Sequence, residues 1–144
     1  MLVLCTGNSA RSQMAESILR DVGGDLIVIE SAGTVPAADI HPFARAAVKK
    51  LLNVDMHGQY PKRLDRFLGE HFDYVITVCD HAAETCPVFP GAPERIHWSF
   101  EDPAAAGGTD DDKRRAFDAT AAGLLERARA WLPSVRARVE GRRA

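Results

Sequence analysis

The sequence is poor in cysteine, in excess charge and in long hydrophobic runs, and each shortage excludes a class of protein. Only three of the 144 residues are cysteine, which argues against a structural disulfide framework and favours catalysis, redox exchange or metal binding. A formal net charge of -2 gives no general attraction to nucleic acid or to a membrane surface. No run approaches a membrane span, and the apolar start at residues 1–4 is too short for a signal peptide. We therefore expect a cytoplasmic protein that binds neither nucleic acid nor membranes.

The chain nevertheless has enough hydrophobic sequence for one core. Hydrophobic residues make up 46% of it, so we expect a single catalytic domain over residues 1–144. Charges of both signs are abundant and no extra apolar face is evident, which favours a monomer.

Strand and helix patterns alternate along the chain. Strand patterns cover residues 2–4, 26–29, 72–79 and 95–100, and helical patterns cover residues 11–22, 41–52, 62–68 and 110–133, the last ending at Pro133. This alternation predicts an α/β fold, a three-layer sandwich with a four-stranded parallel sheet. Such sheets bind ligands at the carboxyl ends of their strands, where Cys5 and Cys79 both lie. We expect these two residues at the same rim.

A short polar loop links the first strand to the first helix. Cys5 precedes Gly7 and Asn8, which tolerate positive φ and allow a sharp turn into the helix that begins near Arg11. Successive amides can then converge beside the positive end of the helix dipole, and the planar guanidinium of Arg11 suits two oxygens at once. The sequence predicts an oxyanion site at Thr6, Gly7, Asn8, Ser9, Ala10, Arg11 and Ser12.

The same positive field favours a thiolate at Cys5. A hydroxyl of Ser12 that donates to this sulfur would strengthen the effect. We therefore predict that Cys5 is a nucleophile directed at a tetrahedral oxyanion. The alternative is that Cys5 is a buried, unreactive strand residue, but such a residue would not require the glycine, asparagine and arginine that follow.

Cys79 and Cys86 form a second informative feature. If the segment between them is helical, their Cα atoms stand about 10.5 Å apart along the axis, whereas a disulfide needs about 7 Å or less. A redox role therefore predicts that this segment unwinds when the bond forms. Two alternatives stay open: unconnected core cysteines, or a zinc site with His81 and His97, although the spacing lacks the close ligand pairs of structural zinc sites.

The Asp102-Pro103 pair supplies a candidate proton donor. Releasing an oxygen from a tetrahedral oxyanion needs an acid, and a carboxyl beside Trp98 and Phe100 would be partly desolvated. An ordinary turn would use the same two residues.

These segments together resemble a known family. Residues 5–16, Cys-Thr-Gly-Asn-Ser-Ala-Arg-Ser-Gln-Met-Ala-Glu, are similar to the catalytic loop of the low-molecular-weight protein tyrosine phosphatase superfamily. The likeness continues through residues 30–34, 74–80, 86–91 and 97–103. The Cys79 and Cys86 pair narrows the resemblance to the thioredoxin-coupled arsenate reductases.

The resemblance implies arsenate reduction by a disulfide relay, with phosphate or sulfate as substrate mimics. Cys5 would attack arsenate and Asp102 would protonate the departing oxygen. Cys79 would then attack Cys5, and Cys86 would attack Cys79. Thioredoxin would reduce the final disulfide, and no cofactor or metal is expected.

Two features of the sequence depart from the family pattern. Phosphatases of the superfamily commonly carry aromatic residues after the Asp-Pro pair, where this chain has Ala104, Ala105 and Ala106, so a phosphotyrosine ring would lack a stacking wall. Some of the reductases bind potassium near the loop, and Lys62 stands where they have an acidic residue. We expect the Lys62 ammonium to replace the ion.

Two other functions stay open at this level. One is a phosphomonoesterase that uses Cys5, Arg11 and Asp102, with a second cysteine protecting Cys5 from oxidation. The other is a non-catalytic module that binds oxyanions or senses redox state.

Overall fold

Four short parallel strands form one sheet, in the order β2-β1-β3-β4. The computed structural model describes residues 1–143. The strands are β1 (Leu2–Cys5), β2 (Glu30–Gly33), β3 (Tyr74–Thr77) and β4 (Glu94–His97). The expected four-stranded parallel sheet is therefore confirmed.

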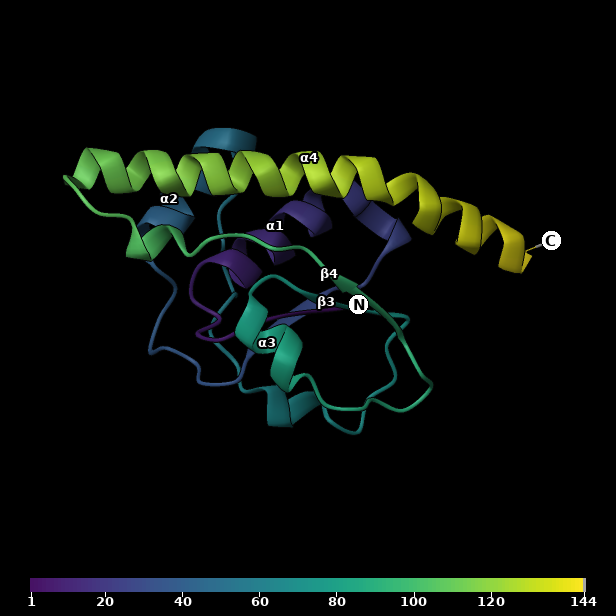
Figure 1. Cartoon of the computed structure of the whole chain (residues 1–144). Coiled ribbons are helices and arrows are strands. Elements are labelled where there is room, and N and C mark those ends of the chain that lie inside the picture. Colours follow the sequence, from purple (N-terminus) through teal and green to yellow (C-terminus); the bar gives the residue numbers. More distant parts are fainter. Residues whose placement is uncertain (144) are drawn as a thin grey trace.

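Helices cover both faces of this sheet. The helices α1 (Arg11–Gly23), α2 (Pro42–Leu52) and α4 (Asp110–Arg143) contact one another, and α1 packs on β1 and β2. The short helix α3 (Asp80–Thr85) contacts β1 and β3 and lies on the opposite side of the sheet from α4 (Figure 1). Three 3-10 turns complete the chain, η1 (Gly24–Leu26), η2 (Leu64–Phe67) and η3 (Pro103–Ala105).

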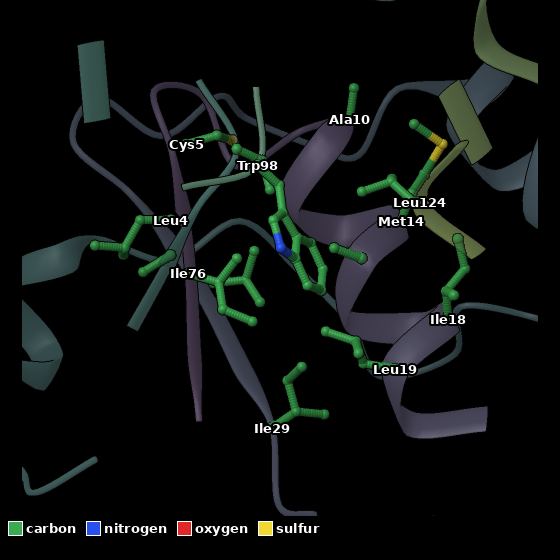
Figure 2. Close-up of a cluster of buried hydrophobic side chains, with 14 of the residues drawn as sticks. Leu4, Cys5, Ala10, Met14, Ile18, Leu19, Ile29, Ile76, Trp98 and Leu124 are labelled. Atoms are coloured by element: carbon green, nitrogen blue, oxygen red, sulfur yellow. The ribbon is translucent and has the colours of Figure 1, made fainter. Parts of the chain in front are cut away.

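The core lies between the sheet and α1. Every residue of β1 is buried, and Met14, Ile18 and Leu19 of α1 are each at most 1% exposed. Trp98 fills the space between these layers near the start of α1 (Figure 2). Because each such side chain contributes about 1.5–3 kcal/mol on burial, this layer fixes β1 and the start of α1, the two elements that flank the cysteine loop.

The strand expected over residues 26–29 is wrong. The second strand is Glu30–Gly33, and Val28, inside the apolar run, is 84% exposed. Residues 30–33 have low strand propensity but pair in parallel with the whole of β1. Pairing with a fully buried strand therefore outweighs local propensity.

Two helix boundaries also differ from expectation. The pattern over residues 62–68 forms only the 3-10 turn η2, and α4 continues through Pro133 to Arg143. Beyond the proline, Val135 is buried, Arg138 stacks on the Tyr74 ring at 4.9 Å, and Arg142 pairs with Asp73 at 3.1 Å. These contacts offset the hydrogen bond that a proline removes from a helix interior.

Within residues 1–143, no helix is long and apolar enough to cross a membrane.

Candidate active site

The cysteine loop, residues 5–11 from the end of β1 to the start of α1, turns its carbonyl groups toward the segment that follows β2. The carbonyls of Cys5, Thr6, Gly7 and Ser9 accept hydrogen bonds from the amides of Thr34, Val35, Ala37 and His41, over distances of 2.8 to 3.3 Å. The carbonyl of Asn8 accepts from Gln13 Nε2 at 3.1 Å. No acceptor among residues 1–143 takes the amides of Gly7, Ser9 and Ala10. With α1 directly behind them, these amides are available to a tetrahedral oxyanion.

The segment that follows β2, residues 34–41, therefore braces the loop through backbone hydrogen bonds. Sequence analysis did not predict these contacts. Gly33 shows how close the approach is, because a Cβ at this position would stand 2.5 Å from the Thr6 carbonyl oxygen. Only a residue without a side chain fits there. A glycine at the end of the strand that pairs with β1 is the available signal, but one sequence does not show that Gly33 lies against Thr6.

The sulfur of Cys5 receives donors on two sides. Asn8 N donates to Cys5 Sγ at 3.2 Å, and Ser12 Oγ lies 2.8 Å from the same sulfur. The Ser12 hydroxyl already accepts from Asn8 Nδ2 at 2.7 Å, so its own proton is free to point at Cys5. Cys5 is 3% exposed. The contact with Ser12 is the one expected from the sequence.

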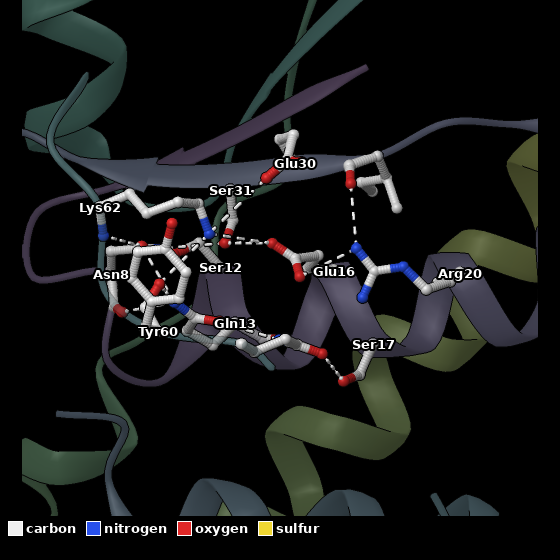
Figure 3. A network of polar contacts seen from close by, with 12 residues as sticks. Asn8, Ser12, Gln13, Glu16, Ser17, Arg20, Glu30, Ser31, Tyr60 and Lys62 are labelled. Atoms are coloured by element: carbon white, nitrogen blue, oxygen red, sulfur yellow. Dashed lines mark hydrogen bonds and ion pairs between the residues drawn. The ribbon is translucent and has the colours of Figure 1, made fainter. Parts of the chain in front are cut away.

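Asn8 holds the loop in shape and is completely buried. Its φ of 47° is left-handed, and Gly7, the other candidate for positive φ, does not adopt one. The Asn8 side chain donates to Ser12 and Ser31 and accepts from Lys62 N at 2.9 Å and Gln13 Nε2 at 3.0 Å (Figure 3). The network fully satisfies a buried amide, so the loop has little freedom to change shape.

Arg11 connects the loop to the segment that contains Asp102. Arg11 Nη1 donates to the Phe100 carbonyl at 2.9 Å, which leaves the other guanidinium donors for a ligand. Asp102 lies two residues further on, where its carboxylate accepts from Ala104 N at 3.0 Å. The expectation of a desolvated carboxyl is wrong, because Asp102 is exposed. Trp98 turns into the core instead of packing over Asp102.

Cys79 lies beside the loop at the carboxyl end of β3. Its sulfur is 3.4 Å from Thr6 Oγ1, and the residue is 5% exposed. Cys79 also caps α3, because its sulfur accepts from Ala82 N at 3.4 Å. The structure therefore brings the second cysteine next to the residue that follows Cys5. All three cysteines are free.

Cys86 stands at the other end of α3. The segment between Cys79 and Cys86 is helical, so the two cysteines cannot bond while the helix is intact. Cys86 lines a small pocket of about 140 Å³ with Thr77, Arg95 and His97. Partial burial raises the pKa of the Cys86 thiol, and the nearby positive charge of Arg95 opposes this shift. Cys86 is therefore a thiol at neutral pH while α3 is folded.

The polar cluster behind the loop carries its own cation. Lys62 is 6% exposed, its ammonium lies 3.5 Å from Glu16 Oε1 and 3.7 Å from Glu30 Oε2, and it donates to the Tyr60 carbonyl at 3.2 Å. Ser31 Oγ donates to the same Glu16 oxygen at 2.8 Å (Figure 3). Potassium does not fit these residues, because a fixed positive charge already faces the carboxylates.

The residues of the alternative zinc site, Cys79, His81, Cys86 and His97, do not form a set of metal ligands. Among residues 1–143, no three His, Cys, Asp or Glu side chains gather in a metal-binding arrangement. His97 contacts Thr77 and Asp80 instead of a cysteine.

Comparisons with known proteins agree with this geometry. The chain is 44% identical over 114 residues to an arsenate reductase of Halalkalibacterium halodurans, covering 79% of this chain and 81% of that protein, and 41% identical over the same length to one of Bacillus subtilis, with the same coverage. A thioredoxin-dependent arsenate reductase of Corynebacterium glutamicum has a similar structure, with a TM-score of 0.70 and 26% identity over 94% of this chain and 61% of that one.

A tyrosine phosphatase from T. tengcongensis shares the fold, with a TM-score of 0.76 at 22% identity over 92% of this chain and 97% of that one. The family model described as low molecular weight phosphotyrosine protein phosphatase matches residues 1–141. By this match and by its relatives, the chain belongs to the low molecular weight phosphotyrosine protein phosphatase family.

Proposed function

We propose that this chain reduces arsenate to arsenite by a three-cysteine disulfide relay that thioredoxin regenerates. The observation that carries the proposal is the position of Cys79, whose sulfur lies 3.4 Å from the side chain of Thr6, the neighbour of Cys5. A phosphatase needs one cysteine, whereas this site has a second one within reach and a third beyond a short helix. The similarity to arsenate reductases at 41% to 44% identity supports the same substrate.

The first step joins arsenate to Cys5. The loop amides and Arg11 hold the arsenate oxygens, and the Cys5 thiolate attacks arsenic. An oxygen leaves as water after accepting a proton, and Asp102 is the proposed donor. The hydrogen bond from Arg11 to the Phe100 carbonyl, two residues before Asp102, supports this assignment. The product is a covalent adduct of As(V) on the Cys5 sulfur.

The next two steps move one disulfide outward. The Cys79 thiolate attacks the Cys5 sulfur, the S–As bond breaks, and its electron pair leaves with arsenic as As(III), arsenite. The Cys86 thiolate then attacks Cys79, and Cys5 leaves as a thiolate ready for another cycle. Thioredoxin donates two electrons and two protons to the Cys79–Cys86 disulfide. We place the reaction in the cytoplasm, because a relay that passes through free thiols needs a reducing compartment. We propose a monomer, because each of these groups belongs to one chain.

A coupled assay tests the relay. Arsenate, thioredoxin, thioredoxin reductase and NADPH are mixed with wild type or with Cys86→Ser, and NADPH consumption is followed. We expect continuous turnover in the wild type and about one arsenite per enzyme in the variant. Thr85→Ala, which keeps all three cysteines, serves as the control and continues to turn over. Continuous arsenate turnover in Cys86→Ser would refute the relay.

A phosphatase remains the second candidate because the matching family model is named for phosphatases and because an oxyanion loop with a cysteine nucleophile suits phosphate ester cleavage as well. Hydrolysis of p-nitrophenyl phosphate distinguishes the two. Rapid hydrolysis in wild type and in Cys86→Ser alike, without arsenate turnover in either, favours the phosphatase. Absence of both reactions favours a non-catalytic module that binds oxyanions.

A further inference from the structure

Two side chains of β4 hold the two ends of α3. His97 Nε2 lies 3.0 Å from the carboxylate of Asp80, the first residue of α3. Arg95 Nη2 donates to the carbonyl of Pro87, just beyond Cys86. Because Arg95 and His97 are two residues apart on one strand, their side chains leave the same face of the sheet. Strand β4 therefore contacts both ends of α3, one end beside Cys79 and the other beside Cys86.

A second hydrogen bond fixes the orientation of the His97 ring. Its other ring nitrogen, Nδ1, lies 2.7 Å from Thr77 Oγ1 on β3. The ring thus joins β3, β4 and the start of α3. The pocket of about 140 Å³ that contains Cys86 is lined by both Arg95 and His97, together with Ala83 of the helix. Both β4 side chains therefore line the space directly beneath α3.

Little else fixes α3 to the rest of the protein. Ala82 is the only buried residue among the six of the helix, and burial of one methyl group contributes about 1 kcal/mol. Six residues are also too few for a helix to be stable by itself. Contacts at the helix ends are therefore a large share of what keeps the segment helical.

Formation of the Cys79–Cys86 disulfide must disturb these contacts. The Cα atoms have to approach from about 10.5 Å to about 7 Å or less. Asp80 and Pro87 adjoin the two cysteines, so at least one of them moves by a distance that a hydrogen bond does not tolerate. The contacts with β4 are thus stronger in the reduced form than in the disulfide form.

We propose that Arg95 and His97 are positioning residues that clamp α3 in its helical form and so set the equilibrium between the Cys79 and Cys86 thiols and their disulfide. The inference rests on the proposed function only for the pairing of these two cysteines. Interactions that exist in one form alone stabilise that form, so the clamp opposes oxidation. Loosening the clamp shifts the pair toward the disulfide.

The test measures this equilibrium directly. Full-length protein with Cys5→Ser, in which only Cys79 and Cys86 can pair, is equilibrated with mixtures of reduced and oxidised dithiothreitol. Oxidised dithiothreitol takes up the two electrons and two protons that the thiols release. His97→Ala and Arg95→Met are each expected to raise the disulfide equilibrium constant about threefold, and the double variant about tenfold. A tenfold change corresponds to a potential about 30 mV more negative.

Matched variants separate a clamp from a general structural role. His97→Gln, whose amide can still reach Asp80, is expected to restore part of the wild-type equilibrium. Glu94→Gln removes a β4 contact with Arg138 of α4 rather than with α3, so the equilibrium should not change. Urea unfolding should show that the double variant is less stable than its parent in the reduced form and equally stable in the disulfide form.

Two outcomes overturn the proposal in distinguishable ways. An unchanged equilibrium in the double variant, or equal loss of stability in both redox forms, shows that Arg95 and His97 do not act on the disulfide. Failure of the Cys5→Ser protein to form any Cys79–Cys86 disulfide refutes the relay itself, and the clamp with it.

Discussion

The cysteine loop and α3 lie at the carboxyl ends of adjacent strands, yet they are built in opposite ways. The carbonyl groups of residues 5–9 all have partners, and Asn8, Ser12 and Gln13 behind them are completely buried. Helix α3 buries only Ala82 and is otherwise held at its ends. One region is held along its whole length, and the other is held mainly at its ends.

The difference matches the two kinds of chemistry that we propose. Stabilising an oxyanion needs donors that are already in place, because any reorganisation at the moment of reaction raises the barrier. Passing a disulfide outward needs two sulfurs to approach each other, which requires a segment that can change shape at small cost.

Loss of the Asn8 side chain should have the largest effect. Asn8→Ala removes four buried hydrogen bonds, so Ser12 and Ser31 each lose a donor and Lys62 N loses its acceptor. Each lost hydrogen bond costs about 0.5–1.5 kcal/mol and an unpaired buried group costs about 1–3 kcal/mol, so we expect the free energy of unfolding to fall by about 4 kcal/mol. Turnover should fall about a hundredfold as the loop loses its shape.

Asn53 provides a matched control for this prediction. It also has a left-handed φ, 55°, but it is an exposed residue at the end of α2. Asn53→Ala should cost about 1 kcal/mol and leave turnover unchanged. Equal losses in the two variants, measured by urea unfolding and the coupled assay, would mean that backbone strain rather than the buried network shapes the loop.

Removal of the internal cation should have the next largest effect. In Lys62→Met, Glu16 keeps Arg20 at 3.1 Å but loses the buried ammonium, and we expect a loss of about 2 kcal/mol. Added potassium should restore part of this stability in the variant only. Lys50→Met, which removes an exposed ion pair with Asp118, should cost less than about 1 kcal/mol. A wild-type melting temperature that responds to potassium but not to sodium would contradict the role of Lys62.

Much of the site could be predicted because its signals are local in sequence. Cys5, Asn8 and Arg11 fall within one loop, and the turn into α1 follows from their backbone preferences. The spacing of Cys79 and Cys86 indicated that a helix between them would prevent their pairing. The parallel sheet followed from the alternation of strands and helices.

The remainder depends on partners distant in sequence. The brace at residues 34–41 uses backbone amides, which leave no mark on residue type. Strand β2 is defined by its pairing with β1 rather than by its own residues. The continuation of α4 through Pro133 depends on contacts of Arg138 and Arg142 with the β3 region. Trp98 is buried and Asp102 is exposed, an arrangement that depends on the packed core and not on their neighbourhood in sequence.

Destabilising α3 from within should have a smaller effect that is confined to one redox form. Ala82→Gly weakens the helix by about 1 kcal/mol, which should raise the Cys79–Cys86 disulfide equilibrium constant about fivefold in the dithiothreitol titration. Ala44→Gly is the control, because Ala44 is equally buried but lies in α2. It should destabilise the reduced and disulfide forms alike. A similar shift of the equilibrium in both variants would show that α3 is not an independent soft element.

The smallest effect should come from the titration of Cys86. Burial raises the pKa of this thiol above its ordinary value of 9.0, so the folded reduced protein holds the proton more tightly than the unfolded chain does. This contribution to stability is fully present below pH 9.0 and is lost as the pH rises through the folded pKa. Unfolding free energies of wild type and Cys86→Ser, measured between pH 7.5 and about 10.5, should therefore diverge only at the alkaline end. Because unwinding of α3 also exposes Cys86, high pH should favour the same open form that the disulfide requires. Parallel curves for the two proteins would mean that α3 is already open before any sulfur reacts.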